Sequence, residues 1–442
     1  MGFKKDFIWG LATSAGQVEG GAADGGRGPS IWDVFSTVPG RIHGGVTPAV
    51  CCDSYHRFDR DVKNLSFVGV DSYRMSISWS RVMPDGTGRL NDAGVDYYKR
   101  CFEALNNAGI KPNVTLYHWD LPQALEEKNG WVNRDVIGWF SEYADKMFRI
   151  FGDVVPLWST VNEPIATYVG YALGAFAPGR RNEKEGNQAR HNILVAHGAA
   201  VDAFRASGAK GDIGIVIDIW KRHAIRDTEE DRRLVIDQDE RNWKFYTDPV
   251  LGGSYSDYLL SHLQSEGTLM DIKDGDLPLM HRPIDFYGLN VYNRVPVSVD
   301  SRAAADFSQG GNFLNNKTEY YPKAVYDAIR LVHELYDLKI PVYITENGTY
   351  SIGEEARGAD GVKEDGDRIR YLAGFLEWLE KAVDEGFDVR GYYLWSLMDN
   401  FEWTAGYNYR FGIFETDFDT LECRPKRSAY WYRDFIKKVK GQ

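Results

Sequence analysis

The sequence predicts an α/β fold in which one closed barrel of parallel strands carries a functional site at the C-terminal ends of its strands. Eight short runs of β-branched or aromatic residues alternate along the chain with stretches of helical periodicity. No block of strands without helices interrupts the alternation, as it would in two separate domains. The 442 residues are many for one domain, but barrels routinely reach such lengths. We therefore expect a single (β/α)8 TIM barrel domain over residues 1–442.

The predicted strands are short and bounded by turn residues. In chain order they cover residues 7–13, 72–77, 113–117, 157–161, 213–217, 286–290, 342–345 and 391–394. Residues 211–240 and the polar region 299–317 are expected to be long connections on the face of the barrel.

Helical patterns lie between most of these strands, at residues 92–108, 134–151, 189–204, 323–336 and 367–385, with a last helix at 428–440. Asn91 and Asn133 are suitable caps, and Gly109 and Gly386 are suitable stops. An open doubly wound sheet is the alternative fold. It is less favoured because no Gly-x-Gly-x-x-Gly follows the first strand, and the glycine-rich stretch 20–28 lacks that spacing.

The composition narrows the classes of partner. A net charge of −12 and a pI near 5.3 disfavour binding to nucleic acid or to an anionic membrane, since both need clustered Lys and Arg. A small uncharged or cationic substrate fits better. The opening residues lack a signal-peptide core and no run of about 18 apolar residues occurs, so we expect a cytoplasmic protein. The four cysteines have neither zinc nor redox spacing and are expected to be free thiols.

Polar or tryptophan residues follow most predicted strands at the point where each strand ends, and in a parallel barrel these ends converge on one pocket. In strand order they are Gln17 and Glu19, Arg74, His118 with Trp119 and Asp120, Asn162 and Glu163, Asn290 and Tyr292, Glu346, and Trp395 with Glu402 and Trp403. The fifth strand, which ends near Asp218, offers no strong candidate. Any one of these residues can be explained by packing, but buried polar groups are costly without partners. Their repetition at one rim favours a functional site.

Two glutamates at strand ends indicate a particular chemistry. Alone, Asn162-Glu163-Pro164 can be a helix start, and Glu346-Asn347-Gly348 can be a turn. Together, two carboxylates that face one another across a sugar can hydrolyse a glycoside without a metal or a cofactor. The sequence therefore predicts neither a bound metal nor a cofactor.

Seven motifs in a fixed order make the chain resemble family 1 of the glycoside hydrolases, the β-glucosidase type, over essentially its whole length. They are FIWGLATSAGQVEG at residues 7–20, YRMSISWSR at 73–81, HWDLP at 118–122, NEP at 162–164, NVY at 290–292, TENG at 345–348 and WSLMDNFEW at 395–403. The resemblance implies a retaining β-glycosidase that hydrolyses unphosphorylated β-D-glycosides from the nonreducing end. The reaction would be a double displacement through a covalent glycosyl-enzyme.

The same resemblance implies roles for individual residues. Glu163 would be the general acid/base and Glu346 the nucleophile, with Arg74 and Tyr292 supporting the nucleophile. The substrate-binding set would be Gln17, His118, Trp119, Asn162, Asn290, Tyr292, Trp395, Glu402 and Trp403. The expected partner is a small-molecule β-glycoside or oligosaccharide, with no nucleic acid and no membrane.

Three alternatives remain open. One is a 6-phospho-β-glycosidase, which Glu402 and Trp403 disfavour because a carboxylate there would repel a 6-phosphate. Another is a catalytically weak sugar-binding barrel, which the presence of both glutamates disfavours. The third is an enzyme whose natural role is transglycosylation. The preferred sugar, the leaving group, the linkage and the oligomeric state are not predicted.

The chain also departs from the family pattern. Gly16 stands where a bulky aromatic residue is usual, so we expect extra space or backbone freedom there, and Val161 replaces the usual Phe. Asp218 stands where Asn is common. The loop that follows, Trp220-Lys221-Arg222, would border the leaving-group site and is expected to select a polar or acidic leaving group.

Overall fold

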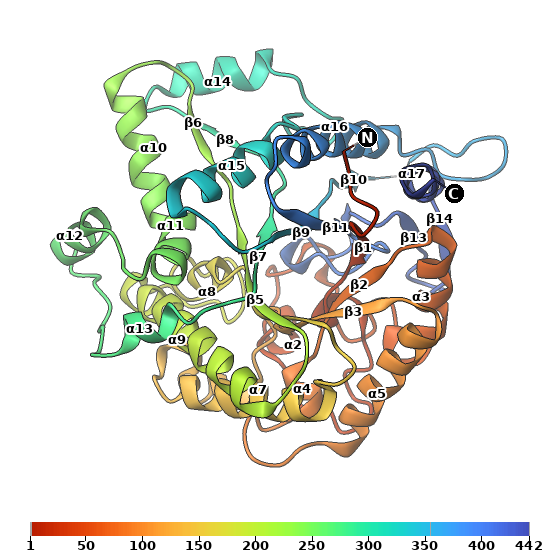
Figure 1. The fold of residues 1–442 in the computed structure, drawn as a ribbon, viewed down its shortest axis with the longest axis horizontal. Helices are drawn as coiled ribbons and strands as arrows, with labels where there is room; N and C mark the ends of the chain where they lie inside the picture. The colour runs from red at the N-terminus through yellow and green to blue at the C-terminus, as the bar shows by residue number, and fades with distance from the viewer. Residues whose placement is uncertain (1, 354, 442) are drawn as a thin grey trace.

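The computed structural model describes residues 2–353 and 355–441, and its centre is a closed barrel of parallel strands (Figure 1). Around the barrel the order is β1-β11-β9-β7-β5-β4-β3-β2. The strands are β1 (Ile8–Ala12), β2 (Ser72–Ser76), β3 (Lys111–Tyr117), β4 (Leu157–Asn162), β5 (Asp212–Asp218), β7 (Phe286–Asn290), β9 (Val342–Asn347) and β11 (Val389–Trp395). Each coincides with one predicted strand, so the predicted (β/α)8 barrel is confirmed.

Helices surround the barrel and connect its strands (Figure 1). The connecting helices are α3 (Ser54–Val68), α5 (Asp92–Asn107), α7 (Val136–Phe151), α9 (Glu183–Ser207), α15 (Ala324–Tyr336) and α16 (Gly366–Asp384), and α17 (Arg427–Lys440) follows the last strand. The predicted helices are all present, although α9 extends beyond the predicted 189–204. The prediction missed α3 because this helix buries only Leu65 and Val68 among its apolar residues, which leaves a weak periodic signal.

The two predicted long connections are wrong in part, because both contain helices. Residues 211–240 include α10 (Glu229–Arg241), and residues 299–317 include α14 (Ser301–Gly310). The buried side chains of α10 are all acidic and α14 buries none, so neither helix has an apolar stripe that a pattern can reveal. With β6 (Arg222–Ala224) and β8 (Val295–Val297), they project at the upper left of Figure 1.

Shorter elements complete the fold. The helices are α1 (Ala15–Val18), α2 (Ile31–Ser36), α4 (Trp79–Val82), α6 (Gln123–Glu126), α8 (Ile165–Tyr171), α11 (Trp243–Thr247), α12 (Asp257–Ser265) and α13 (Asp276–Met280). Two antiparallel pairs join β10 (Ser351–Ile352) to β12 (Tyr409–Arg410), and β13 (Phe414–Thr416) to β14 (Cys423–Pro425).

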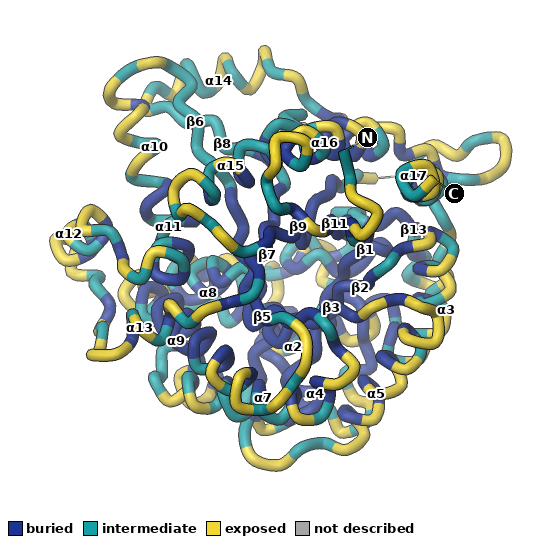
Figure 2. Tube along the Cα trace, in the orientation of Figure 1, coloured by how far each residue is buried: buried dark blue, intermediate teal, exposed yellow. Residues whose placement is uncertain are grey.

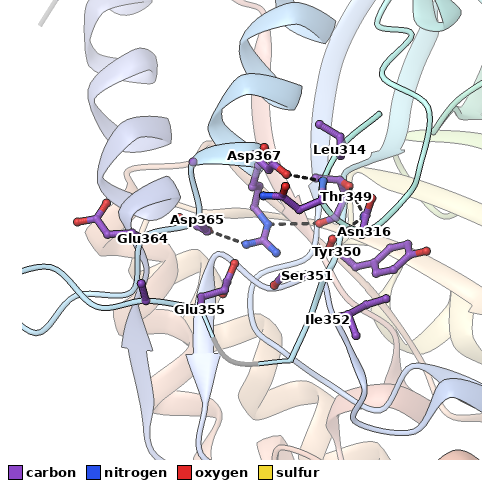
Figure 3. Close-up of a pocket in the computed structure, with 14 residues that line it drawn as sticks. Leu314, Asn316, Thr349, Tyr350, Ser351, Ile352, Glu355, Glu364, Asp365 and Asp367 are labelled. Atoms are coloured by element: carbon purple, nitrogen blue, oxygen red, sulfur yellow. Dashed lines mark hydrogen bonds and ion pairs between the residues drawn. The ribbon is translucent and has the colours of Figure 1, made fainter. Parts of the chain in front are cut away.

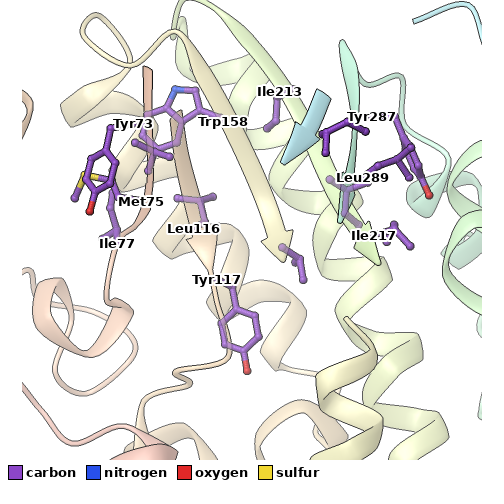
Figure 4. Packing of buried hydrophobic residues seen from close by; sticks show 14 of the residues in the cluster. Tyr73, Met75, Ile77, Leu116, Tyr117, Trp158, Ile213, Ile217, Tyr287 and Leu289 are labelled. Atoms are coloured by element: carbon purple, nitrogen blue, oxygen red, sulfur yellow. The ribbon is translucent and has the colours of Figure 1, made fainter. Parts of the chain in front are cut away.

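The barrel strands are buried on both faces, as Figure 2 shows. On their outer faces, side chains such as Tyr73, Ile213 and Leu289 belong to the large core between the strands and the helices (Figure 4). A second, smaller cluster consists of Ala12, Leu157, Phe286, Tyr343, Tyr393 and Trp395. The filled barrel is therefore a rigid support for the residues at its carboxyl end.

No helix among residues 2–353 and 355–441 is both long and apolar enough to cross a membrane. All four cysteines are free, as the sequence predicted.

We expect Trp9→Ala to lower the free energy of unfolding by about 3–5 kcal/mol, because the change leaves a cavity in a packed core. Trp9 is 1% exposed. The centroid of its ring lies 4.7, 5.2 and 6.1 Å from the ring centroids of Phe7, Phe435 and Tyr392. Urea unfolding followed by circular dichroism measures the loss. Val154→Ala, at a side chain that is 42% exposed, is the control, and an equal effect of both changes would contradict the assignment of Trp9 to the core.

Candidate active site

A pocket of about 400 Å³ opens among the loops that follow the carboxyl ends of the barrel strands. The predicted site residues that line it are Gln17, His118, Trp119, Glu163, Tyr292, Glu346, Trp395, Glu402 and Trp403. The remaining predicted residues, Arg74, Asn162 and Asn290, are fully buried and hydrogen-bond to the residues that line it. The structure therefore brings the predicted catalytic and substrate-binding residues to one place. Glu19 and Asp120, which also follow strand ends, are buried and do not line the pocket.

Glu346 receives a charged and a neutral hydrogen bond, one on each carboxylate oxygen. Arg74 Nη1 donates to Glu346 Oε1 over 2.5 Å, and the Tyr292 hydroxyl donates to Glu346 Oε2 over 2.6 Å. The ion pair is almost completely buried, so little water screens it. Charge-assisted hydrogen bonds of this kind stabilise the anionic form of a carboxyl group.

Glu163 has a different environment. It follows β4, and Asn290 Nδ2 donates to its Oε1 over 2.7 Å. Burial raises the pKa of Glu163 well above its usual value, and the charges of Asp218 and Glu346 raise it further. Among the described residues, no Lys or Arg forms an ion pair with Glu163, so its environment favours the protonated form of this carboxyl group.

A network of hydrogen bonds fixes the two carboxyl groups relative to each other. Arg74 Nη2 and Asn290 Nδ2 both donate to Asn162 Oδ1, over 2.6 and 3.0 Å. Asn290 in turn accepts a hydrogen bond from the Thr345 hydroxyl at 2.7 Å, and Asn162 Nδ2 lies 3.2 Å from His118 Nε2. Arg74 and Asn290 each bind one glutamate and share Asn162, so the three side chains set the spacing of the pair.

Two shifts in strand register accompany this arrangement. The pairing of β4 with β5 shifts between Ser159 and Asn162, and the pairing of β7 with β9 shifts between Leu289 and Asn290. Irregularities of this type occur next to active sites, where they redirect a side chain. Both catalytic candidates lie at or just after such a shift.

Three residues of the pocket, Trp119, Glu163 and Trp403, have left-handed backbone conformations, with φ of 78°, 44° and 47°. This conformation costs roughly 1–2 kcal/mol for a residue that has a Cβ atom. Strain of this kind persists where the surrounding structure enforces it, and it gathers at functional sites.

Flat aromatic surfaces and hydrogen-bonding groups share the wall of the pocket. The Trp403 ring lies 4.8 Å from the Trp119 ring, and the His118 ring lies 5.8 Å from the Trp395 ring. Burial and the charge of Arg74 lower the pKa of His118 well below its usual value, so its imidazole is neutral. Such a combination suits a ring with apolar faces and polar edges.

Gln17 and Glu402 form the polar edge of this wall. Gln17 Nε2 donates to Glu402 Oε2 over 3.1 Å. Burial, with the charge of Glu346, raises the pKa of Glu402 to about 8. Both side chains can therefore bond to hydroxyl groups of a neutral ligand.

The loop after β5 contributes only Trp220 to the pocket, where its ring stacks on the Tyr292 ring at 5.9 Å. Lys221 Nζ is paired with Asp239 Oδ2 at 2.5 Å, and Arg222 Nη1 donates to the Trp220 carbonyl at 2.8 Å. Neither cation lines the pocket. This removes the basis for the expectation that the loop selects an acidic leaving group.

Some residues of the pocket were not predicted from the sequence. They are Thr318, Gly348, Thr349, Tyr350, Tyr371 and Phe411. Gly348 belongs to the TENG motif but was assigned no role. The others lie in loops or on a helix, and no periodicity or motif distinguishes them. The Tyr350 and Phe411 rings are 5.2 Å apart, which makes the entrance aromatic as well.

The loop that carries Thr349 and Tyr350 also lines a second, polar pocket beside the first (Figure 3). Arg368 Nε donates to the Thr349 carbonyl at 3.3 Å, and Arg368 Nη1 is paired with Asp365. Asn316 Nδ2 donates to the Tyr350 carbonyl at 2.6 Å. These bonds position one wall of the site.

The extra space expected beside Gly16 is bounded by Trp403 and Asp120. A Cβ atom added there would lie 3.4 Å from the Trp403 ring and 3.7 Å from the Cβ atom of Asp120. These are ordinary van der Waals distances, so the position has room for a Cβ atom between Trp403 and Asp120.

The sequence matches the model of a family described as Glycosyl hydrolase family 1 over residues 1–441. Two curated relatives named Beta-glucosidase A, from Acetivibrio thermocellus and Thermotoga maritima, are 41% and 40% identical to this chain over 98% of each chain. The solved family 1 β-glucosidase from Thermotoga maritima has a TM-score of 0.93 and 39% identity, and covers 99% of this chain and 98% of its own. A solved β-glucosidase from that organism in complex with deoxynojirimycin has a TM-score of 0.90 and 37% identity over 98% of each chain.

Two buried acids, Glu402 in the pocket and Asp218 on β5, should make stability depend on pH. The pKa of Asp218 is raised from 3.8 to about 7 and that of Glu402 from 4.5 to about 8, so the folded state binds more protons than the unfolded state between those values. We therefore expect the contribution of these two acids to the free energy of unfolding to fall as the pH rises from about 5 to about 8.

In the same pH range, Glu402→Gln should reduce the fall in the free energy of unfolding by up to about 4 kcal/mol, because the amide of Gln does not titrate. Urea unfolding at several pH values measures the effect. Glu103→Gln, at an exposed position, is the control. A Glu402→Gln protein with an unaltered pH dependence would contradict the prediction.

Proposed function

The chain belongs to glycosyl hydrolase family 1, and we propose that Glu163 and Glu346 perform the two steps of its retaining β-glycosidase reaction. Its sequence relatives and structural neighbours are β-glucosidases, and the protein is a glycoside hydrolase of that type. The observation that supports the division of roles is the unequal bonding of the two carboxyl groups. Glu346 is paired with Arg74, whereas Glu163 is buried with an amide partner.

In the first step, the Glu346 carboxylate attacks the anomeric carbon and Glu163 gives its proton to the departing oxygen. The bonds from Arg74 and Tyr292 hold Glu346 in place for this attack. The product is a covalent glycosyl-enzyme of inverted configuration.

In the second step, Glu163 acts as a base. Esterification removes the charge of Glu346, and that charge is one of the causes that raise the pKa of Glu163. The pKa of Glu163 therefore falls, and the group can accept a proton from the water that attacks the ester. The second inversion restores the configuration of the substrate.

The other predicted residues bind the sugar in this proposal. Asn162, fixed by Arg74 and Asn290, would bond to the 2-hydroxyl group, a contact that strengthens in the transition state. Gln17, His118, Trp119, Glu402 and Trp403 would bind the other hydroxyl groups, and Trp395 would lie beneath the ring.

The lining of the pocket favours an unphosphorylated substrate. No Lys or Arg is among the described residues that line it, and Glu402 stands at its polar edge. A phosphate group would be desolvated there without a cation. Nothing in the site favours a 6-phospho-β-glycosidase, and the presence of both glutamates disfavours a weak sugar-binding barrel.

We also propose that residues 1–442 form one catalytic domain, and that the protein acts in the cytoplasm on a small β-glycoside or oligosaccharide. The match to the family over residues 1–441 and the deoxynojirimycin complex of a structural neighbour support the first and last of these points.

Glu163→Ala tests the assignment of the acid/base. The variant should still form the glycosyl-enzyme from substrates with very good leaving groups, because these need no proton, but its hydrolysis should be slow. Added azide should accelerate turnover and give a β-glycosyl azide, since a small anion replaces the water that Glu163 would activate. Proton NMR of the product identifies the anomer.

Glu346→Ala is the matched control. This variant cannot form the covalent intermediate, so azide should displace the leaving group directly and give the α-anomer. An α-azide from Glu163→Ala, or a β-azide from Glu346→Ala, would reverse the assignment.

A further inference from the structure

Asp218 occupies an inward position at the carboxyl end of β5. The Cα partners in β5 and β7 are Gly214 with Phe286 and Asp218 with Asn290. Phe286 belongs to the smaller cluster, which is separate from the core that holds Ile213 and Leu289. Because side chains alternate along a strand, Asp218 faces the barrel interior, on the same level as Asn290.

Hydrogen bonds tie Glu163 to this part of the barrel. The Glu163 N–H donates to the Val216 carbonyl over 2.9 Å, two residues before Asp218. The Glu163 carboxyl group accepts from Asn290, the Cα partner of Asp218 in β7. The backbone and the carboxyl group of Glu163 are thus both held next to the end of β5.

The Asp218 carboxyl group is buried without a neutralising partner. Its residue is 5% exposed, and among the described residues no Lys or Arg forms an ion pair with it. The charged and titratable groups that interact electrostatically with it are Arg222 on the following loop, Glu163 after β4, Glu346 on β9, Tyr287 on β7 and Tyr246 on α11. Arg74, the other cation nearby, is bound to Glu346.

We propose that Asp218 is a third carboxylate of the active site, a positioning residue whose negative charge holds the proton on Glu163. This inference rests on the proposed acid/base role of Glu163. Asp218 lines no part of the pocket, so it acts on the substrate only through Glu163.

The charges that act on the two acids support this role. Burial raises the pKa of Asp218 to about 7, with Arg222 opposing, whereas the pKa of Glu163 is raised well above its usual value and Asp218 is the largest charge that raises it. The negative charge of an ionised Asp218 therefore opposes ionisation of Glu163. The enzyme keeps its acid protonated to a higher pH.

The test is the pH profile of kcat/KM for Asp218→Asn with an aryl β-glucoside that has a poor leaving group. Asn keeps the shape of the side chain and removes its charge. The basic limb of the profile should move to lower pH, so that the ratio of kcat/KM at about pH 8 to that at about pH 6 falls roughly tenfold. An unmoved basic limb would overturn the proposal.

Asp218→Ser separates charge from packing. It also removes the charge but changes the size of the side chain, and it remains available if the Asn variant does not fold. Both variants should move the basic limb in the same direction, whereas opposite shifts would point to packing and overturn the proposal. Asp239→Asn, which removes the carboxylate paired with Lys221, should leave the basic limb in place.

A Glu163→Ala background distinguishes failure of this inference from failure of the proposed function. With a dinitrophenyl glucoside the basic limb should be absent in Glu163→Ala, and Asp218→Asn should then cause no shift. If the basic limb persists in Glu163→Ala alone, the acid/base role is wrong. If it disappears there but Asp218→Asn does not move it in the presence of Glu163, only the role of Asp218 is wrong.

Discussion

One guanidinium group in a cluster of buried acids determines how this site works. Arg74 is fully buried, and its two terminal nitrogens bind Glu346 and Asn162. A buried carboxylate without such a partner would take up a proton, as the environment of Glu163 favours. In the proposed mechanism, the pairing of Arg74 with Glu346 therefore makes Glu346 the nucleophile and leaves the proton on Glu163. Arg74 belongs to strand β2, so the barrel itself fixes the position of this cation.

The barrel and the position of the site could be predicted from the sequence because their causes are local. Short apolar runs give the strands, and residues such as His118 and Glu402 follow strand ends in chain order. The pairing of Lys221 with Asp239 could not be predicted, since it depends on α10, a helix without an apolar face. The importance of Asp218 was missed for a similar reason, because only the register with β7 brings it to the level of Asn290.

The arrangement has a cost in stability. The left-handed residues Trp119, Glu163 and Trp403 are strained, and Glu402 is buried with a raised pKa. The large core between the strands and helices offsets these unfavourable terms. This separation of a packed barrel from a strained rim is the usual compromise between stability and activity.

The central claim, that Glu346 is the residue that bonds to the sugar, is tested most directly by trapping the intermediate. A 2-deoxy-2-fluoro-β-glucosyl fluoride should form a glycosyl-enzyme that hydrolyses slowly, because the fluorine destabilises the oxocarbenium-like transition state of both steps, whereas the fluoride leaving group accelerates only the first. Mass spectrometry of the intact protein should show one added fluoroglucosyl group, and proteolysis should locate it on the peptide that contains Glu346. A label on the peptide that contains Glu163, or inactivation without any covalent label, would contradict the account.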